Sequence, residues 1–320
     1  MKKIVLYNPS ISSTNIGDEI IFESAYKALR KKLDGAYVAN ISTHLPVSQT
    51  FAKIYKNADF KYVCGTNLLR NNLFGRFRQW DINIFNVKKL GPCVLLGVGW
   101  HNDGKWLNPY TKYLYKTILD KNALHSVRDE YTKTRLEKLG FKNVINTGCP
   151  TMWDLTPEFC AKIPKTKAQK VVFTLTDYKK NAEQDRKIIE ILKEEYGEVN
   201  LWLQGYNDFE YAKSIGVLDK VNIIDPSLAA YDKFLTENDV DYIGTRLHGG
   251  VRALQHGRRT MIIAVDNRAL EKKKDFNLPV VRREELTEEA LMAIINEERA
   301  TDIVIPEENI RIWKEAHGLI

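Results

Sequence analysis

The densest group of chemically active side chains in the 320-residue chain lies in residues 241–252, DYIGTRLHGGVR. An apolar run ends at Ile243 and a helical pattern begins near Gly250, so Arg246 and His248 are expected in the turn between strand and helix. Helix N-termini attract anions, and a guanidinium matches the planar shape of carboxylate and phosphate groups. An imidazole such as that of His248 titrates near neutral pH. We therefore predict an anion site with a proton-transferring group, the alternative for the imidazole being a structural role in the turn.

A second polar loop, residues 8–19, follows the first apolar run and precedes a helical pattern. It contains Asn15, Gly17 and Asp18. Asn and Asp often cap helices because their side chains accept hydrogen bonds from free N–H groups, so a purely structural role is one interpretation. The loop is long for a strand–helix connection, which usually takes about two to six residues. The extra length favours a binding role.

Arg128 follows a short apolar run and directly precedes two acidic residues, Asp129 and Glu130. Two interpretations are open for its guanidinium. It either forms a local ion pair, which contributes little when exposed, or it points from the end of a strand toward a ligand.

Small and polar residues also follow two other predicted strands, in residues 64–67 and 97–101. Glycines there allow a ligand to approach the backbone closely, and Asn67 and His101 lie at the ends of these segments. The spacing is not GxGxxG, and no acidic residue stands where a ribose would need it. A dinucleotide site is therefore disfavoured.

Short apolar runs alternate with helical patterns along the whole chain, which is typical of parallel strands covered on both faces. We predict an α/β protein of two Rossmann-like, doubly wound domains. The first covers residues 1–155 and the second residues 171–320, including a C-terminal helix, with residues 156–170 as a polar, proline-containing linker. In such folds ligands bind beyond the carboxyl ends of the strands, where the loops described above lie.

Composition narrows the possible partners. The chain has 48 Lys and Arg against 41 Asp and Glu, a net charge of +7 spread along the sequence rather than gathered in a tail. This fits a small anion or a weak membrane-surface preference, and we expect no nucleic-acid partner. No apolar stretch approaches the ~18 residues of a membrane span. The four cysteines lack CxxC spacing and the six histidines form no HxH or HExxH motif, so we expect buried thiols, a cytoplasmic location and no metal site.

These loops, in this order, resemble the polysaccharide pyruvyl transferase family. The resemblance rests on the following elements: Asn15-Ile16-Gly17-Asp18, Gly65, Gly97-Val98-Gly99, Ser126-Val127-Arg128-Asp129, Gly148-Cys149-Pro150, Arg246-Leu247-His248-Gly249, Gly257 and the strand 262–266. The sequence departs from the family pattern at Cys64-Gly65-Thr66-Asn67, where many members have three glycines, and at Cys149-Pro150, where many have Asp-Pro.

The resemblance implies a fold like that of GT-B glycosyltransferases and the transfer of a pyruvyl group from phosphoenolpyruvate to two hydroxyls of a sugar, which forms a cyclic ketal. It implies that the positions matching Asp18, Arg128, Arg246, Leu247 and His248 belong to the site. The acceptor would be a sugar of a surface polysaccharide or exopolysaccharide, free or carried on a lipid at the inner face of the membrane. The N-terminal domain would take the acceptor, and the C-terminal domain would take phosphoenolpyruvate.

On this basis Arg246 and Arg128 are expected to grip phosphoenolpyruvate between the domains, helped by N–H groups near Gly249 and Gly250. His248 is expected to act as the acid and Asp18 as the base, although these roles can be exchanged. Further predicted binding residues are Leu247, Asn15, Gly17, Asn67 and His101. Neither a cofactor nor a metal is expected. The competing hypotheses are a GT-B glycosyltransferase that uses a nucleotide sugar and a carbohydrate-binding protein without catalysis.

Overall fold

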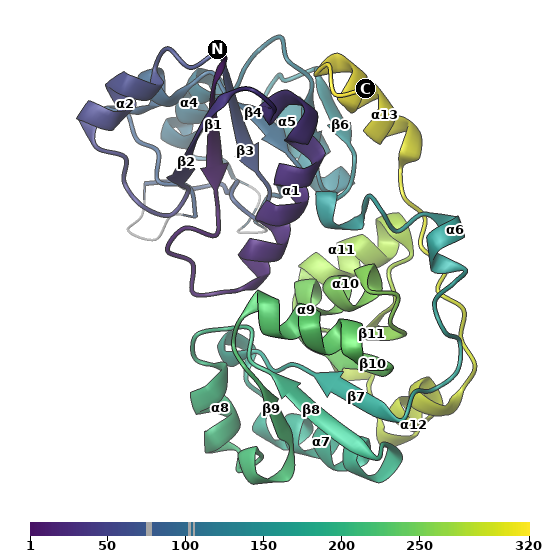
Figure 1. Cartoon of the computed structure of the whole chain (residues 1–320). Helices are drawn as coiled ribbons and strands as arrows, with labels where there is room; N and C mark the ends of the chain where they lie inside the picture. The colour runs from purple at the N-terminus through teal and green to yellow at the C-terminus, as the bar shows by residue number, and fades with distance from the viewer. Residues whose placement is uncertain (75–78, 102–103, 105) are drawn as a thin grey trace. The chain divides into compact units, whose positions relative to one another are not determined.

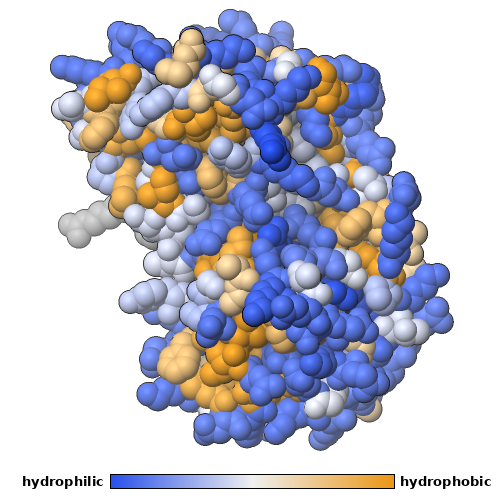
Figure 2. All heavy atoms as spheres, viewed as in Figure 1, coloured by the Kyte–Doolittle hydropathy of each residue, from blue (hydrophilic) through white to orange (hydrophobic). Residues whose placement is uncertain are grey.

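The computed structural model describes residues 1–74, 79–101, 104 and 106–320. The chain divides into two compact units. The first contains residues 1–13, 21–153 and 305–320, and the second contains residues 14–20 and 154–304. Hydrophilic side chains cover most of the face shown in Figure 2, as expected for a chain in which charged residues make up 28%.

The first unit contains a parallel sheet of four strands in the order β2-β1-β3-β4, with the two-stranded parallel sheet β5-β6 next to it. Isolated pairing of Val98 with Val127 and a hydrogen bond from Gly97 N to Ser126 O join the end of β4 to β5. The strands are β1 (Lys3–Asn8), β2 (Tyr37–Ser42), β3 (Phe60–Cys64), β4 (Val94–Leu96), β5 (His125–Val127) and β6 (Val144–Asn146). The helices are α1 (Gly17–Leu33), α2 (Gln49–Tyr55), α3 (Val87–Leu90), α4 (Pro109–Ile118), α5 (Glu130–Lys138) and α13 (Glu307–Ala316).

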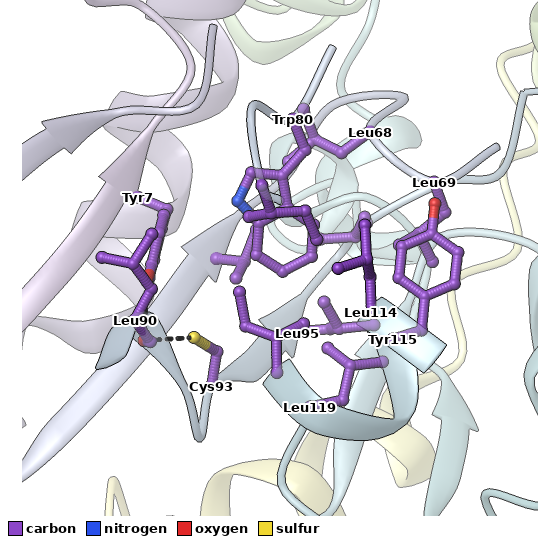
Figure 3. Close-up of a cluster of buried hydrophobic side chains, with 14 of the residues drawn as sticks. Tyr7, Leu68, Leu69, Trp80, Leu90, Cys93, Leu95, Leu114, Tyr115 and Leu119 are labelled. Atoms are coloured by element: carbon purple, nitrogen blue, oxygen red, sulfur yellow. Dashed lines mark hydrogen bonds between the residues drawn. The ribbon is translucent and has the colours of Figure 1, made fainter. Parts of the chain in front are cut away.

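Burial of apolar side chains between this sheet and its helices forms the core of the first unit (Figure 3). The rings of Tyr7 and Trp80 meet edge to face with their centroids 5.7 Å apart. The hydroxyl of Tyr7 donates to the carbonyl of Leu90 at 2.7 Å, so this buried polar group is satisfied. The strands and helices of the first unit thus share one apolar core.

The second unit is built on a parallel sheet of six strands in the order β12-β11-β10-β7-β8-β9. Helices cover both faces: α7 and α12 lie on one face, and α9, α10 and α11 lie on the other (Figure 1). The strands are β7 (Lys170–Phe173), β8 (Glu198–Trp202), β9 (Asn222–Ile224), β10 (Val240–Gly244), β11 (Thr260–Ala264) and β12 (Val280–Arg282). The helices are α6 (Pro157–Cys160), α7 (Ala182–Glu195), α8 (Asp208–Ser214), α9 (Leu228–Glu237), α10 (Leu247–Gln255), α11 (Asn267–Phe276) and α12 (Glu288–Asn296).

Both sheets confirm the predicted pair of Rossmann-like α/β folds. The short, largely apolar runs of the sequence form the strands of both sheets. Helix α10 differs, because it begins at Leu247 instead of near Gly250. His248, Gly249 and Gly250 therefore lie in its first turn and not in the preceding loop.

The structure groups three segments differently from the predicted division 1–155, 156–170 and 171–320. Helix α13 packs on the first unit, where Trp313 donates to the carbonyl of Leu124 at 3.0 Å and its ring lies 5.8 Å from that of Trp153. Residues 14–20, which include the first turn of α1, belong to the second unit. Residues 156–170 also belong to the second unit and contain α6. An amphipathic pattern shows that α13 has a buried face but does not show which core receives it.

Candidate active site

The turn that carries Arg246 is fixed between the two central strands of the second unit. Strand β10 ends at Gly244, where a Cβ atom would lie only 2.5 Å from Thr174 Oγ1 and 2.6 Å from Thr174 N. Only glycine allows β10 to approach the end of β7 so closely. The N–H of Thr245 then donates to Thr174 O, and the N–H of Arg246 donates to Thr174 Oγ1, both at 3.1 Å. These bonds set the direction in which α10 begins.

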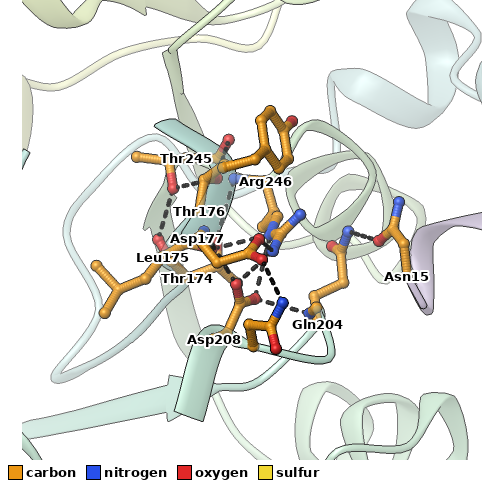
Figure 4. Close-up of polar contacts among 12 residues, drawn as sticks. Asn15, Thr174, Leu175, Thr176, Asp177, Gln204, Asp208, Thr245 and Arg246 are labelled. Atoms are coloured by element: carbon orange, nitrogen blue, oxygen red, sulfur yellow. Dashed lines mark hydrogen bonds and ion pairs between the residues drawn. The ribbon is translucent and has the colours of Figure 1, made fainter. Parts of the chain in front are cut away.

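The guanidinium of Arg246 is buried and held on one edge by two carboxylates (Figure 4). Its Nε donates to Leu175 O at 2.9 Å and to Asp208 Oδ2 at 3.1 Å. Its Nη2 donates to Asp177 Oδ1 at 2.9 Å and to Asp208 Oδ1. Burial opposes the charged form, but the bonds and charge of Asp208 outweigh it and raise the pKa of Arg246. The remaining nitrogen, Nη1, has no hydrogen bond to any residue that the structure describes.

The turn after β8 connects this arginine to the predicted Asn15 loop. A Cβ atom on Gly205 would lie 2.0 Å from Arg246 Nη2, so the guanidinium rests directly on the glycine backbone. Gly205 pairs with Asn15 in an antiparallel bridge, and the N–H of Ile16 donates to Gln204 O at 3.0 Å. The side-chain Nε2 of Gln204 donates to Asn15 Oδ1 at 2.7 Å. The second unit thus brings together the Asn15 loop and the Arg246 turn, 231 positions apart in the sequence by subtraction of their numbers.

Asn15 also has the structural role that was its alternative interpretation. Its Oδ1 accepts the N–H of Gly17 at 3.1 Å, at the start of α1. A Cβ atom on Gly17 would lie 2.8 Å from Gln204 Nε2, so Gly17 lies directly against the end of the Gln204 side chain. Asp18 follows in the first turn of α1 and is 7% exposed.

The first turn of α10 contains the other predicted residues of the second unit. His248 and Leu247 are buried, as are both following glycines. A Cβ atom on Gly250 would lie 2.5 Å from Ile262 Cγ1, and its N–H donates to Arg246 O at 3.2 Å. Gly250 therefore allows helix α10 to pack closely on β11. Its N–H donates within the helix, whereas the sequence predicts that it helps to bind an anion. Gly249 faces Gln204, whose Oε1 would lie 3.0 Å from a Cβ atom there.

Arg128 has the local ion pair that was one of its two interpretations, but the pair is buried. Its Nε donates to Asp129 Oδ2 at 3.1 Å, and both side chains are 6% exposed. Its Nη2 donates to Asn67 Oδ1 at 3.0 Å, which places two predicted residues of the first unit in contact. A Cβ atom on Gly99 would lie 2.1 Å from Arg128 Nε, so this guanidinium also rests on a glycine. As in Arg246, Nη1 has no hydrogen bond to any described residue.

The remaining predictions about the site have different outcomes. His101 lies in the connection between β4 and α4, is exposed, and donates its backbone N–H to Leu69 O at 2.6 Å. Arg128 belongs to the first unit and Arg246 to the second, so their joint grip on one anion stays a prediction. Sequence analysis missed Asp177, Asp208 and Gln204. Single acidic or amide residues after β7 and β8 give no signal until the sheet order places the ends of these strands near the end of β10.

The described residues also bear on metal, membrane and thiol predictions. Among them, no group of three or more His, Cys, Asp or Glu could hold a metal ion. None of the helices within these residues has the length and apolar character needed to cross a membrane. All four cysteines are free and buried, as predicted. Burial raises the pKa of Cys64, which keeps that thiol protonated and unreactive.

Fold and site together define a class: an α/β protein of GT-B-like fold, with polar loops at the carboxyl ends of parallel strands. The S. aureus MnaA–UDP co-structure has this fold, with a TM-score of 0.52, 12% sequence identity, and coverage of 100% of this chain and 98% of that chain. The UDP-GlcNAc 2-epimerase from Neisseria meningitidis bound to UDP-GlcNAc matches with a TM-score of 0.49, 11% identity and 99% coverage of both chains. A comparison with curated proteins found no match.

The family model of polysaccharide pyruvyl transferase matches residues 15–267, which is more than half of the chain. The chain therefore belongs to the polysaccharide pyruvyl transferase family, as the sequence motifs indicated. The matched region begins at Asn15 and includes the Arg246 turn, so it spans both loops that the second unit brings together.

Proposed function

We propose that this protein transfers a pyruvyl group from phosphoenolpyruvate to two hydroxyls of a polysaccharide sugar. The observation that carries the proposal is the Arg246 turn: within a chain of this family, a buried guanidinium keeps one nitrogen without a hydrogen bond among the described residues, beside the first turn of α10. Phosphoenolpyruvate is a small, highly charged enol ester, and it is recognised better by directed donors than by a large apolar area. Each charge-assisted hydrogen bond contributes about 1.5–3 kcal/mol.

The proposed reaction begins with a proton transfer to the methylene carbon of phosphoenolpyruvate, which leaves an oxocarbenium-like centre at C2. One sugar hydroxyl attacks this carbon and loses its proton. The C2–O bond to phosphate then breaks with its electron pair on phosphate, and a second hydroxyl attacks C2 to close the ketal. One of the two hydroxyl protons replaces the proton spent on the methylene carbon, and the other leaves with phosphate or solvent.

Four residues are proposed to carry these steps. Arg246 binds the carboxylate or phosphate through Nη1, and Arg128 contributes a second guanidinium. His248, in the first turn of α10, is the proposed acid, and Asp18 the proposed base for the sugar hydroxyls, with the exchange of these two roles as the alternative. The reaction as written uses only proton transfers and charge stabilisation by side chains, so we propose that it proceeds without a metal or a cofactor.

The proposed acceptor is a sugar of a surface polysaccharide or exopolysaccharide, free or carried on a lipid. We propose a cytoplasmic place of action, which extends to the inner face of the membrane when the acceptor is lipid-linked. Four free, buried cysteines support it, because disulfides are rare in reducing compartments. No nucleic-acid partner is proposed.

The direct test incubates the protein with phosphoenolpyruvate and a panel of glycans and monitors the release of inorganic phosphate by ³¹P NMR. The proposal predicts release that depends on both substrates and a product mass increased by the pyruvyl ketal. A parallel thermal-shift screen compares phosphoenolpyruvate with UDP-sugars and GDP-sugars. Stabilisation by a nucleotide sugar and not by phosphoenolpyruvate would replace the proposal with glycosyl transfer.

A further inference from the structure

Asp208 has the most constrained carboxylate around the Arg246 turn (Figure 4). It is 0% exposed at the start of α8, and both of its oxygens are fully engaged. Oδ2 accepts from Gly205 N at 2.7 Å and from Arg246 Nε at 3.1 Å. Oδ1 accepts from Asp177 N at 3.2 Å and from Arg246 Nη2. Two backbone donors therefore fix the carboxylate, and the carboxylate fixes the arginine.

This arrangement determines which part of Arg246 can meet a ligand. Nε and Nη2 form one edge of the planar guanidinium, and that edge is filled by Asp208 with help from Asp177 and Leu175. A bidentate contact also fixes the plane of the group, since both donors must stay aligned with both oxygens. Rotation of the guanidinium would break the contact and leave buried charges unpaired.

We propose that Asp208 is a positioning residue of the transferase site: it holds the guanidinium of Arg246 so that Nη1 is presented to the anionic donor substrate. The inference rests on the proposed function for the identity of that substrate. In this proposal Asp208 does not contact the substrate, and it acts on substrate binding only through Arg246.

The two carboxylates beside Arg246 allow electrostatic attraction and positioning to be distinguished by experiment. One guanidinium charge faces two carboxylates, the buried Asp208 and Asp177, whose side chain is 18% exposed. Removing a negative charge beside an anion site strengthens anion binding if Coulomb attraction alone decides. Positioning by Asp208 predicts the opposite sign, because the arginine loses its alignment.

Asp208→Asn removes the charge with little change in shape, but it replaces one oxygen with an NH₂ group. That group faces either Gly205 N and Arg246 Nε or Asp177 N and Arg246 Nη2, so donors meet donors and the guanidinium must move. Asp177→Asn differs, because Asp177 accepts only one bond from Arg246 and an amide oxygen can keep it. The two variants remove the same charge and separate position from electrostatics.

Asp241→Asn supplies a matched control in the same unit. Asp241 is also a buried carboxylate paired with an arginine: it accepts from Arg259 Nη1 and from Tyr196 OH, both at 2.7 Å. It lies near the start of β10, whereas Arg246 follows its end. The control therefore reports the general effect of losing a buried carboxylate in this unit.

Binding of phosphoenolpyruvate is measured by titration calorimetry below the melting temperature of each variant. We expect Asp208→Asn to raise Kd by about tenfold or more, Asp177→Asn to leave Kd equal or lower it, and Asp241→Asn to leave Kd within twofold of wild type. An unchanged or lower Kd in folded Asp208→Asn would overturn the proposal.

A second readout is independent of phosphoenolpyruvate. The side-chain Nε–H signal of Arg246 is assigned in ¹H–¹⁵N spectra by its loss in Arg246→Lys, and its exchange with solvent is measured. Positioning predicts slow exchange in the wild type and faster exchange in Asp208→Asn. Rapid exchange in the wild type overturns the proposal even when Asp208→Asn does not fold. If the wild type fails to bind phosphoenolpyruvate, the proposed function fails, and this signal alone decides the role of Asp208.

Discussion

Gly205 offers a way to move Arg246 without changing any charged residue. A Cβ atom on Gly205 would lie 2.0 Å from Arg246 Nη2 and 2.8 Å from Cζ. Non-bonded carbon contacts are about 3.5–4.0 Å, so an added methyl must displace the guanidinium by at least about 1.5 Å. The backbone of Gly205 is not in the left-handed region, so alanine is compatible with its φ angle. The atoms that must give way are mainly the end of a side chain, and the fold should therefore survive.

A misplacement of about 1 Å can cost roughly 100-fold in rate. We therefore expect Gly205→Ala to lower kcat/KM for phosphoenolpyruvate by about 100-fold, measured as initial rates of phosphate release. Gly197→Ala is the control, since its added Cβ would meet only Gln169 O, at 3.6 Å, and its φ angle also allows alanine. The reasoning is refuted if Gly205→Ala has a native circular dichroism spectrum and retains kcat/KM within twofold of Gly197→Ala.

Three further predictions use other parts of the structure. Gly99→Ala should displace Arg128, because its Cβ would lie 2.1 Å from Arg128 Nε; we expect a loss of transfer rate in variant protein that has a native circular dichroism spectrum, and an unchanged rate would remove Arg128 from the site. Arg283→Met leaves the buried carboxylate of Asp185 without its ion pair and should lower the unfolding free energy in urea by about 3–5 kcal/mol; a loss below about 1 kcal/mol contradicts this. Burial lowers the pKa of His125 in the folded protein. Below the ordinary histidine pKa of about 6.5, the unfolded chain therefore binds more protons than the folded chain. The free energy of unfolding should accordingly be lower at about pH 5.5 than at about pH 7.5. His125→Gln should reduce that difference, and an equal difference in both proteins would show that His125 does not cause it.

Most strands were predictable because they are largely apolar runs bounded by polar or small residues, which is typical of parallel sheets covered on both faces. The start of α10 was not, since glycine disfavours helix and two glycines in a row suggested a loop. The structure shows why they are inside the helix: a Cβ atom on Gly250 would lie 2.5 Å from Ile262 of β11. Close packing between helix and strand outweighs the local preference.

The residues of the candidate site also differ in whether the sequence alone predicts them. Arg246, His248 and Asn15 were recognisable because the segments that contain them have an unusual composition and follow predicted strands. Asp208 could not be recognised, because it is one acidic residue among many until the sheet order places β8 and β10 on the two sides of β7. Sequence patterns identify the groups that can bind or transfer protons, whereas the groups that hold them in place emerge only from the packing.

The central claim is that the Arg246 turn binds phosphoenolpyruvate. Titration calorimetry of phosphoenolpyruvate with the wild type and with Arg246→Met tests it most directly, with UDP-sugars and GDP-sugars as competing ligands. The account predicts micromolar to millimolar binding of phosphoenolpyruvate by the wild type, loss of this binding in Arg246→Met, and no binding of either class of nucleotide sugar. Binding of a nucleotide sugar without binding of phosphoenolpyruvate, or binding that is unaffected by Arg246→Met, would contradict it.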